Sequence, residues 1–282
     1  MLASSLPFTL LTPGLAIGTT APDDWQRLTT LPLLIVVGVT GVGKSTTLQQ
    51  LTQKHLAYSL LPNRRVLTDQ LIISPMQADE NQPVQPVHDR QIRFDYTRRY
   101  RQRFAGGMSY ALSQLWLDRK GWDKRLLFDG LRGVDEVAHA IVVFPQARFI
   151  VLHAPDAVRV QRLLGRNDTF DQIASEDCQT SLGAAANPFA SMGLPEAQTL
   201  FNAGEARHWA GLIAQGSLSA TDLRAKLQIV LEERRNYDQT ATLALLRSAA
   251  PTRTLAIDTA QVAPTQVAEM IVAWVKDDGD RP

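Results

Sequence analysis

A glycine-rich segment has the residue types and spacing of a phosphate-binding loop. Gly38, Gly41 and Gly43 are followed by Lys44 and Ser45, in the pattern G-x-x-x-x-G-K-S. Such glycines let backbone N–H groups turn toward an anion, and a following helix adds positive potential. Lys44 is expected to neutralise the terminal phosphates, and the Ser45 hydroxyl to bind Mg²⁺. The segment predicts ATP and Mg²⁺ as cofactors, held by Gly38, Thr40, Gly41, Val42, Gly43, Lys44, Ser45 and Thr46.

A second candidate group follows the apolar run 126–128, which reads as a buried strand. Asp129 ends this run and is followed by Gly130, Leu131 and Arg132. A carboxylate at a strand end can hold the water shell of a magnesium ion bound by the loop. An ordinary Asp-Gly turn would look the same. The alternating strand–helix pattern that separates Asp129 from the loop favours the metal role.

Asp69 is the candidate for contact with an acceptor hydroxyl. The segment 65–68 reads as the second strand of a parallel sheet, which would place Asp69 beside the glycine-rich loop. A carboxylate there could orient a hydroxyl for in-line attack and accept its proton. A turn or helix-capping aspartate is an equally good interpretation.

Two groups of arginines could bind phosphate. Arg159, Arg162 and Arg166 are spaced by three and four residues, so one helix face could present all of them as a lid or as a solvated surface. Arg162 and Arg166 are the better candidates for nucleotide contact. A second group is interleaved with aromatic residues, and it could bind an anionic acceptor or single-stranded nucleic acid. Equally, the aromatic stripe could be core and the arginines its solvated face; they are Arg90, Arg93, Arg98, Arg99, Arg101 and Arg103.

Strand-like runs that alternate with helical patterns predict a parallel sheet with crossover helices. The expected strands are 33–37, 65–68, 126–128, 148–152 and 254–257. A polar, proline-bearing stretch at 74–86 reads as a loop, and a long helical pattern spans 92–116 with a break at Gly106-Gly107. Further helices are expected at 156–164, after Ser219 and toward 275, and the weakly patterned stretch 170–218 reads as part of an inserted helical region at about 170–250.

The segment 129–132 resembles the Asp-Gly-x-Arg element of dephospho-coenzyme-A-kinase-like proteins. It is one residue shorter than the Asp-Gly-x-x-Arg element of nucleoside monophosphate kinases. Residues 154–168 resemble the lid of these kinases, and the likeness covers about 32–170 and 250–276. It implies a P-loop kinase of the class that includes shikimate and adenylate kinases. It also implies that one lid arginine closes over the phosphates while another packs on the adenine, and that an aspartate at the position of Asp69 binds the acceptor.

Composition limits the remaining possibilities. The chain has 282 residues, 45% of them hydrophobic, and a formal charge of +1, which argues against a globally basic nucleic-acid binder. A single cysteine, Cys178, fits a reducing compartment. No apolar run suggests a membrane span, and the first residues lack the basic start of a secretory signal, so a cytoplasmic protein is expected. Residues 1–30 are expected to be an N-terminal extension, of which the first 20 residues are partly ordered at best.

These observations predict an α/β P-loop NTPase fold with a five-stranded parallel sheet flanked by helices, over residues 31–282. The expected activity is transfer of the γ-phosphoryl group of ATP to a small, anionic acceptor. Lys44, Asp69, Arg132 and Arg162 are the candidate catalytic residues, and Ser45 with Asp129 the candidate metal ligands. The alternatives are a regulatory NTPase that acts through a partner protein and a nucleic-acid end kinase.

Overall fold

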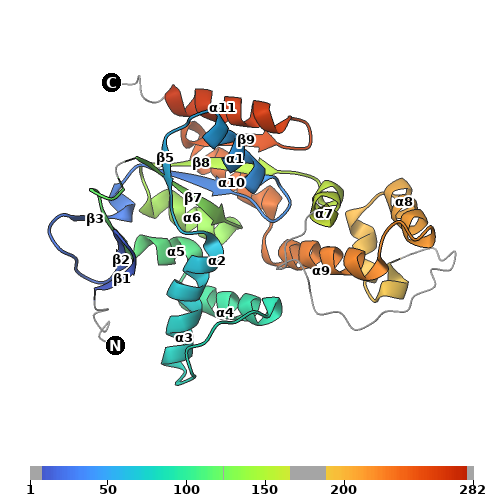
Figure 1. The fold of residues 1–282 in the computed structure, drawn as a ribbon, viewed down its shortest axis with the longest axis horizontal. Coiled ribbons are helices and arrows are strands. Elements are labelled where there is room, and N and C mark those ends of the chain that lie inside the picture. Colours follow the sequence, from blue (N-terminus) through green and yellow to red (C-terminus); the bar gives the residue numbers. More distant parts are fainter. Residues whose placement is uncertain (1–7, 123, 166–188, 278–282) are drawn as a thin grey trace.

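The central element of the fold is a five-stranded parallel sheet. The computed structural model describes residues 8–122, 124–165 and 189–277, so Arg166 and Cys178 lie outside the described residues. The strand order is β5-β7-β4-β8-β9, and every neighbouring pair is parallel (Figure 1). The strands are β4 (Leu33–Val37), β5 (Tyr58–Leu60), β7 (Arg125–Leu131), β8 (Ala147–His153) and β9 (Thr254–Asp258).

Strand β4 shows why the sheet needs cover on both faces. All five of its residues are apolar and buried. Leu33, Ile35 and Val37 belong to the core on one face, and Leu34 and Val36 to the core on the other. A strand buried on both sides reads as a continuous apolar run rather than an alternating one. The sequence therefore fixes β4 as a central strand.

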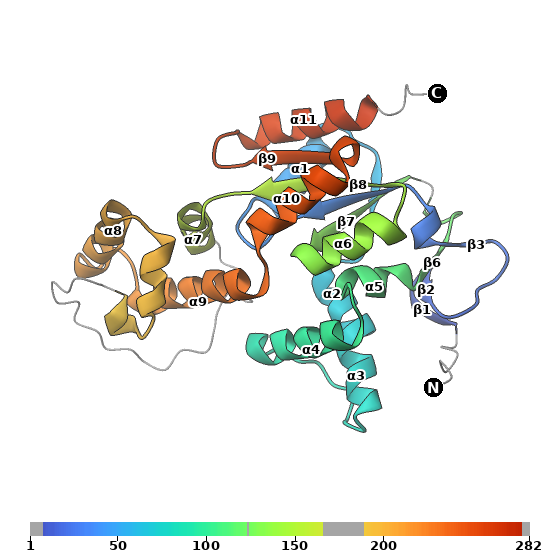
Figure 2. The same ribbon diagram turned by 180° about the vertical axis from the view of Figure 1, so that it is seen from behind.

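Helices cover the two faces. Helices α1 (Lys44–Gln53) and α11 (Pro264–Lys276) pack together on one face. Helices α5 (Met108–Ser113), α6 (Val134–Val143) and α10 (Gln239–Ala249) cover the other (Figure 2). The expected α/β architecture of a five-stranded parallel sheet flanked by helices is confirmed.

The second strand of the sheet is not where the sequence pattern predicts it. Residues 65–68 lie in helix α2 (Arg64–Thr68), and the edge strand is β5. The side chain of Asn63 caps the helix by accepting a hydrogen bond from the Val66 N–H at 3.0 Å, which favours helix over strand at this point. The expectation of a strand at 65–68 is wrong, because these residues form a helix that Asn63 caps.

The chain after α2 remains helical. It forms the π-helix η2 (Asp69–Ile73) and then α3 (Ser74–Asp79). The expected loop at 74–86 is therefore wrong for its first six residues, which are helical and follow η2 without a break.

Helix α4 (Arg90–Arg103) places part of its aromatic stripe in the core. Tyr96 and Tyr100 are buried. Gly106 and Gly107 then break the helix with φ angles of 94° and 50°. The stripe does not resume after α5, because Leu115 and Trp116 belong to strand β6 (Leu115–Asp118).

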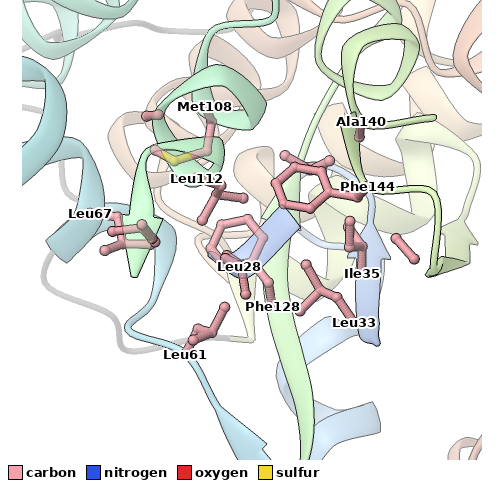
Figure 3. Packing of buried hydrophobic residues seen from close by; sticks show 14 of the residues in the cluster. Leu28, Leu33, Ile35, Leu61, Leu67, Met108, Leu112, Phe128, Ala140 and Phe144 are labelled. Carbon is pink, nitrogen blue, oxygen red and sulfur yellow. The ribbon is translucent and has the colours of Figure 1, made fainter. Parts of the chain in front are cut away.

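The N-terminal residues form a small antiparallel sheet. Its strands are β1 (Thr9–Thr12), β2 (Leu15–Ile17), β3 (Trp25–Arg27) and β6, in the order β1-β2-β6-β3. The order from residue 8 onward exceeds the expected partial order, because β6, far along the chain, pairs with β2 and β3. The short 3-10 helix η1 (Leu28–Thr30) joins this sheet to β4, and its Leu28 lies in the main core near Phe128 (Figure 3).

The helical region between β8 and β9 has a core of its own. It begins with α7 (Asp156–Leu164) and continues through the 3-10 turns η4 (Ala190–Met192) and η5 (Pro195–Leu200). Helices α8 (Ala203–Ala214) and α9 (Ala220–Asn236) follow, and Ser219 caps α9 as expected. Apolar residues of α7, α8 and α9 form one cluster to the side of the main sheet.

Helix α10 and the 3-10 helix η6 (Pro251–Arg253) return the chain to β9. Within the described ranges, every helix is too short or too polar to traverse a lipid bilayer.

Candidate functional site

The glycine-rich loop joins the central strand β4 to helix α1. Gly41 and Gly43 have φ angles of 86° and 93°, a conformation that side chains disfavour. A Cβ atom on Gly41 would lie 3.0 Å from the Cβ atom of Arg159, so the loop also needs glycine there for space. Lys44 begins α1 and its Nζ donates to the Val39 carbonyl at 3.0 Å. The strand–loop–helix context expected from the sequence is present.

A cavity of about 370 Å³ opens beside this loop. Lys44 and Ser45 of the loop lie on its wall together with Asp129 and Arg132 of the β7 segment. The parallel pairing of β4 with β7 explains this meeting, since Val36 is opposite Asp129. Residues separated widely in the sequence are thus brought to the carboxyl ends of adjacent strands, where open α/β sheets bind ligands.

Asp129, which lines this cavity, has an unsatisfied carboxylate oxygen. Its Oδ1 is buried and accepts no hydrogen bond from any described residue. An unpaired buried carboxylate oxygen is costly unless a cation or donor binds it. A carboxylate beside a hydroxyl, that of Ser45, is an oxygen donor set suited to Mg²⁺. Among the described residues, no group of three or more His, Cys, Asp or Glu side chains could hold a metal ion.

The cavity wall carries mainly positive charge. Asp129 is the single carboxylate among its lining residues, which include six cations: Lys44, Arg64, Arg65, Arg90, Arg93 and Arg132. Arg64 is held in place by Glu136 at 2.6 Å and by the Gly130 carbonyl at 2.6 Å. Burial alone would lower the pKa of Arg64, but the charges and hydrogen bonds of Glu136 and Tyr237 together outweigh burial and raise it. The net positive charge of the wall favours the binding of an anion.

Helix α4 divides its arginines between two roles. Arg90 and Arg93, in the first turn, line the cavity together with Phe94. The later arginines of the cluster point elsewhere, toward carboxylates or the end of α9. Arg98 and Arg99 pair with Asp95, Arg103 pairs with Asp79 at 2.6 Å, and Arg101 approaches Asn236.

Asp69 lies apart from the position that the sequence predicts. It is in the π-helix η2 rather than at a strand end, and it does not line the cavity. Its side chain is 42% exposed and forms an ion pair with Arg93, which does line the cavity. Asp69 therefore contacts the cavity wall only through Arg93. Its role as a base stays a prediction.

The arginines of α7 contact the glycine-rich loop from its other side. Arg162 donates to the Gly41 carbonyl at 3.2 Å and to the Thr259 carbonyl at 2.7 Å. It also lines a second cavity of about 260 Å³ with Thr46, Val262 and Val267. Burial lowers the pKa of Arg162, although Asp258 raises it. Arg162 is thus next to the loop, as the lid hypothesis requires.

Arg159 is not exposed on a lid surface. Its side chain is fully buried, and its Nε donates to the Thr40 carbonyl at 2.8 Å. Its other nitrogens bind Asp156 and Glu233 at 2.6 Å and 2.5 Å. Arg159 therefore supports the loop from behind, with its donors occupied by protein.

Glu233 is a buried residue of the site that the sequence analysis missed. Near the end of α9, it accepts hydrogen bonds from Thr40, Arg132 and Arg159, and Arg90 lies 3.6 Å away. Burial alone would raise the pKa of Glu233, but the charges of these arginines and the Thr40 hydrogen bond lower it to about 2. One signal could have revealed it: position 233 lies three residues after Val230, on the buried face of α9.

Comparison with known proteins adds little to this geometry. No protein-family model matches the chain, and no curated protein is significantly similar to it. Among solved structures, the chain is similar to an unliganded sugar kinase from Janibacter sp. HTCC2649. The likeness has 14% identity and a TM-score of 0.35, over 87% of this chain and 95% of that chain. A TM-score this low transfers neither the fold nor the activity of that protein to this chain.

Proposed function

We propose that the chain is an ATP-dependent kinase with a P-loop NTPase fold, which transfers a γ-phosphoryl group to a small anionic acceptor. One observation carries the proposal. The Lys44 and Ser45 pair of the glycine-rich loop, the unsatisfied Asp129 carboxylate and a wall of arginines meet in one cavity. That combination suits a triphosphate with its cation on one side and a second anion on the other.

On the donor side, the loop backbone and Lys44 bind the phosphates. Lys44 and Arg132 stabilise the negative charge that develops on the transferring group. Ser45 and Asp129 would hold a magnesium ion, which supplies charge neutralisation at the phosphates. Arg162 and Thr46, around the second cavity, provide the contact with the rest of the nucleotide.

On the acceptor side, Arg90 and Arg93 bind an anionic group of the second substrate. Phe94 offers an apolar surface beside them. A cavity of about 370 Å³ is at the small end of ordinary ligand sites and favours a small molecule over a polymer. Asp69, paired with Arg93, would contact the acceptor hydroxyl directly, orient it for attack and accept its proton.

The burial of Tyr96 and Tyr100 weakens the nucleic-acid alternative. Base stacking on single strands requires exposed aromatic faces, and these two are in the core. A regulatory NTPase would still be consistent with the contacts between the insertion and the loop, and it differs from a kinase in its products.

A panel of acceptors with γ-labelled ATP tests the proposal. The panel contains nucleosides, nucleotides, sugar phosphates and coenzyme precursors, with Lys44→Ala as the inactive control. We expect label transfer to at least one anionic acceptor, and loss of transfer in the variant. Steady ATP hydrolysis without transfer to any acceptor would favour the regulatory NTPase instead, and absence of ATP binding would exclude both.

A further inference from the structure

The peptide segment at Thr40 is held from both sides by the helical insertion. Its N–H donates to Glu233 Oε2 at 3.0 Å, and its carbonyl accepts from Arg159 Nε at 2.8 Å. The Thr40 hydroxyl donates to Glu233 Oε1 at 2.5 Å. Glu233 and Arg159 both have no exposed side-chain surface, so water does not compete for these contacts. The glycine-rich loop is therefore fixed to α7 and α9.

The same carboxylate holds a residue of the phosphate-facing wall. Glu233 Oε1 accepts from Arg132 Nη1 at 2.7 Å. Arg132 Nε is buried and donates to no described residue, so this guanidinium still has donor capacity for a ligand. A planar guanidinium that is fixed at one end by a buried carboxylate can present its remaining N–H groups in one orientation only.

The insertion core makes this attachment rigid. Val160 and Leu163 of α7 lie in one buried cluster with Leu227 and Val230 of α9. Arg159 and Glu233 are thus carried by two helices that pack as a unit. Thr40 and Arg132 both donate hydrogen bonds to Glu233, which belongs to that unit.

We propose that Glu233 is a positioning residue for phosphoryl transfer, which acts by orienting Arg132 toward the γ-phosphoryl group. The proposal rests on the kinase function proposed above. A displacement of about 1 Å in a group that stabilises the charge on the transferring phosphoryl group lowers turnover by roughly 100-fold. A purely structural ion pair would instead affect folding without selecting the chemical step.

Glu233→Gln separates these two roles because of how the two oxygens are used. An amide oxygen in place of Oε2 keeps the acceptor for Thr40 N–H and Arg159. The amide NH₂ group then replaces Oε1, and it cannot accept from Arg132 or from the Thr40 hydroxyl, although that hydroxyl can turn and accept from the NH₂ group. The substitution therefore removes the hold on Arg132 and retains the hold on the loop backbone.

The experiment is a double-mutant cycle with Glu233→Gln and Arg132→Met, read as kcat, KM for ATP and ADP affinity. We expect Glu233→Gln to lower kcat by roughly 10- to 100-fold. ADP affinity should stay within about threefold, since the variant still has an acceptor for the loop backbone. The double variant should have the kcat of Arg132→Met within about threefold, because Glu233 acts through that arginine.

The charge-balanced double variant and a control variant in the same insertion distinguish a loss of orientation from a loss of folding. The double variant removes one negative and one positive charge, so it keeps the charge balance of the buried cluster even if Glu233→Gln alone folds poorly. Glu196→Gln removes a carboxylate of the same insertion that pairs with Arg235 at 2.8 Å, and it should leave kcat unchanged.

Multiplicative losses in the double variant, or an unchanged kcat in folded Glu233→Gln, would overturn the assignment of Glu233 while leaving the kinase intact. A wild-type chain that binds ATP and transfers nothing would overturn the proposed function, and this assignment with it.

Discussion

At the scale of single residues, the site contains groups that the protein satisfies and groups that it leaves for a ligand. Arg159 and Glu233 are buried and fully engaged with each other and with Thr40. Asp129 Oδ1 and Arg132 Nε are also buried, yet neither has a hydrogen-bond partner among the described residues. Leaving a buried polar atom unpaired costs about 1–3 kcal/mol, which ligand binding can recover. Asp129 Oδ1 suits a cation, and Arg132 Nε suits an anion.

Asp129→Asn tests the cation half of this pair. The amide removes the negative charge. We therefore expect turnover to fall by roughly 100-fold and the Mg²⁺ concentration needed for half-maximal turnover to rise. ATP binding without Mg²⁺ should be kept or strengthened, because a negative charge near the phosphates is removed. Titration of ATP without Mg²⁺ measures the binding, and turnover at increasing Mg²⁺ concentrations measures the rate and the Mg²⁺ requirement. Asp24→Asn, at an exposed ion pair with Lys120, is the matched control, and equal Mg²⁺ dependence in the two variants would contradict the assignment.

Asp69→Asn tests the acceptor contact. If Asp69 takes part in catalysis on a hydroxyl, kcat should fall by roughly 100-fold or more with ATP affinity near normal. Because Asp69 pairs with Arg93, the variant also removes one ion-pair partner of that arginine, and Arg93→Lys serves as the comparison. An acceptor KM that rises equally in both variants, with kcat unchanged, would restrict Asp69 to holding Arg93.

At the scale of elements, a buried ion cluster joins α9 and α7 to the glycine-rich loop. The pKa of Glu233 is lowered from 4.5 to about 2 in the folded chain, so its carboxylate stabilises the fold above its unfolded pKa. That contribution is lost as the pH falls from about 4.5 through 2, and it is roughly 3 kcal/mol. Acid should therefore loosen the attachment of the insertion.

Urea unfolding of the wild type and of the charge-balanced Glu233→Gln/Arg132→Met variant, at pH 7 and pH 3, measures this contribution. We expect the free energy of unfolding to fall more steeply with acid in the wild type, by roughly 2–3 kcal/mol. Equal losses in the two proteins would show that other carboxylates account for the acid sensitivity.

The elements also show what sequence patterns can and cannot specify. Strand β4, the loop and α1 are fixed by local signals, since a continuous apolar run and a Gly-x-x-x-x-Gly-Lys-Ser pattern leave few alternatives. The position of Asp129 at the cavity could be predicted in the same way, because it ends an apolar run that forms the neighbouring strand β7. The edge strand β5 is only three residues long, and its identity depends on pairing with β7 rather than on its own sequence. The N-terminal sheet depends in the same way on β6, which the sequence pattern assigned to a helix.

At the scale of the whole molecule, the chain brings three distant regions together around one cavity. The central sheet supplies the loop and Asp129, the α2–α4 region supplies arginines, and the end of α9 supplies Tyr237 and the buried Glu233. Sequence reasoning located the first two regions. It could not place Glu233 at the loop, because a contact over 193 residues depends on how the insertion folds back.

The insertion core should therefore affect the site at a distance. Leu227→Ala removes a fully buried side chain from that core, and we expect a loss of about 2–5 kcal/mol in the free energy of unfolding. In protein that remains folded, hydrogen exchange at the loop 38–43 should become faster, because its anchor on α9 is loosened. Leu246→Ala in α10, equally buried in the main core, is the control, and faster loop exchange in that variant alone would contradict the coupling.

The most direct test of the account is a crystal structure with Mg²⁺ and a non-hydrolysable ATP analogue. We predict that the γ-phosphate lies within hydrogen-bond distance of Lys44 and Arg132, with Mg²⁺ between Ser45 and Asp129. Arg90 and Arg93 should face open space beside the γ-phosphate, where an acceptor can enter. Phosphates bound away from the glycine-rich loop, or a metal ion that does not involve Asp129, would contradict the central claim.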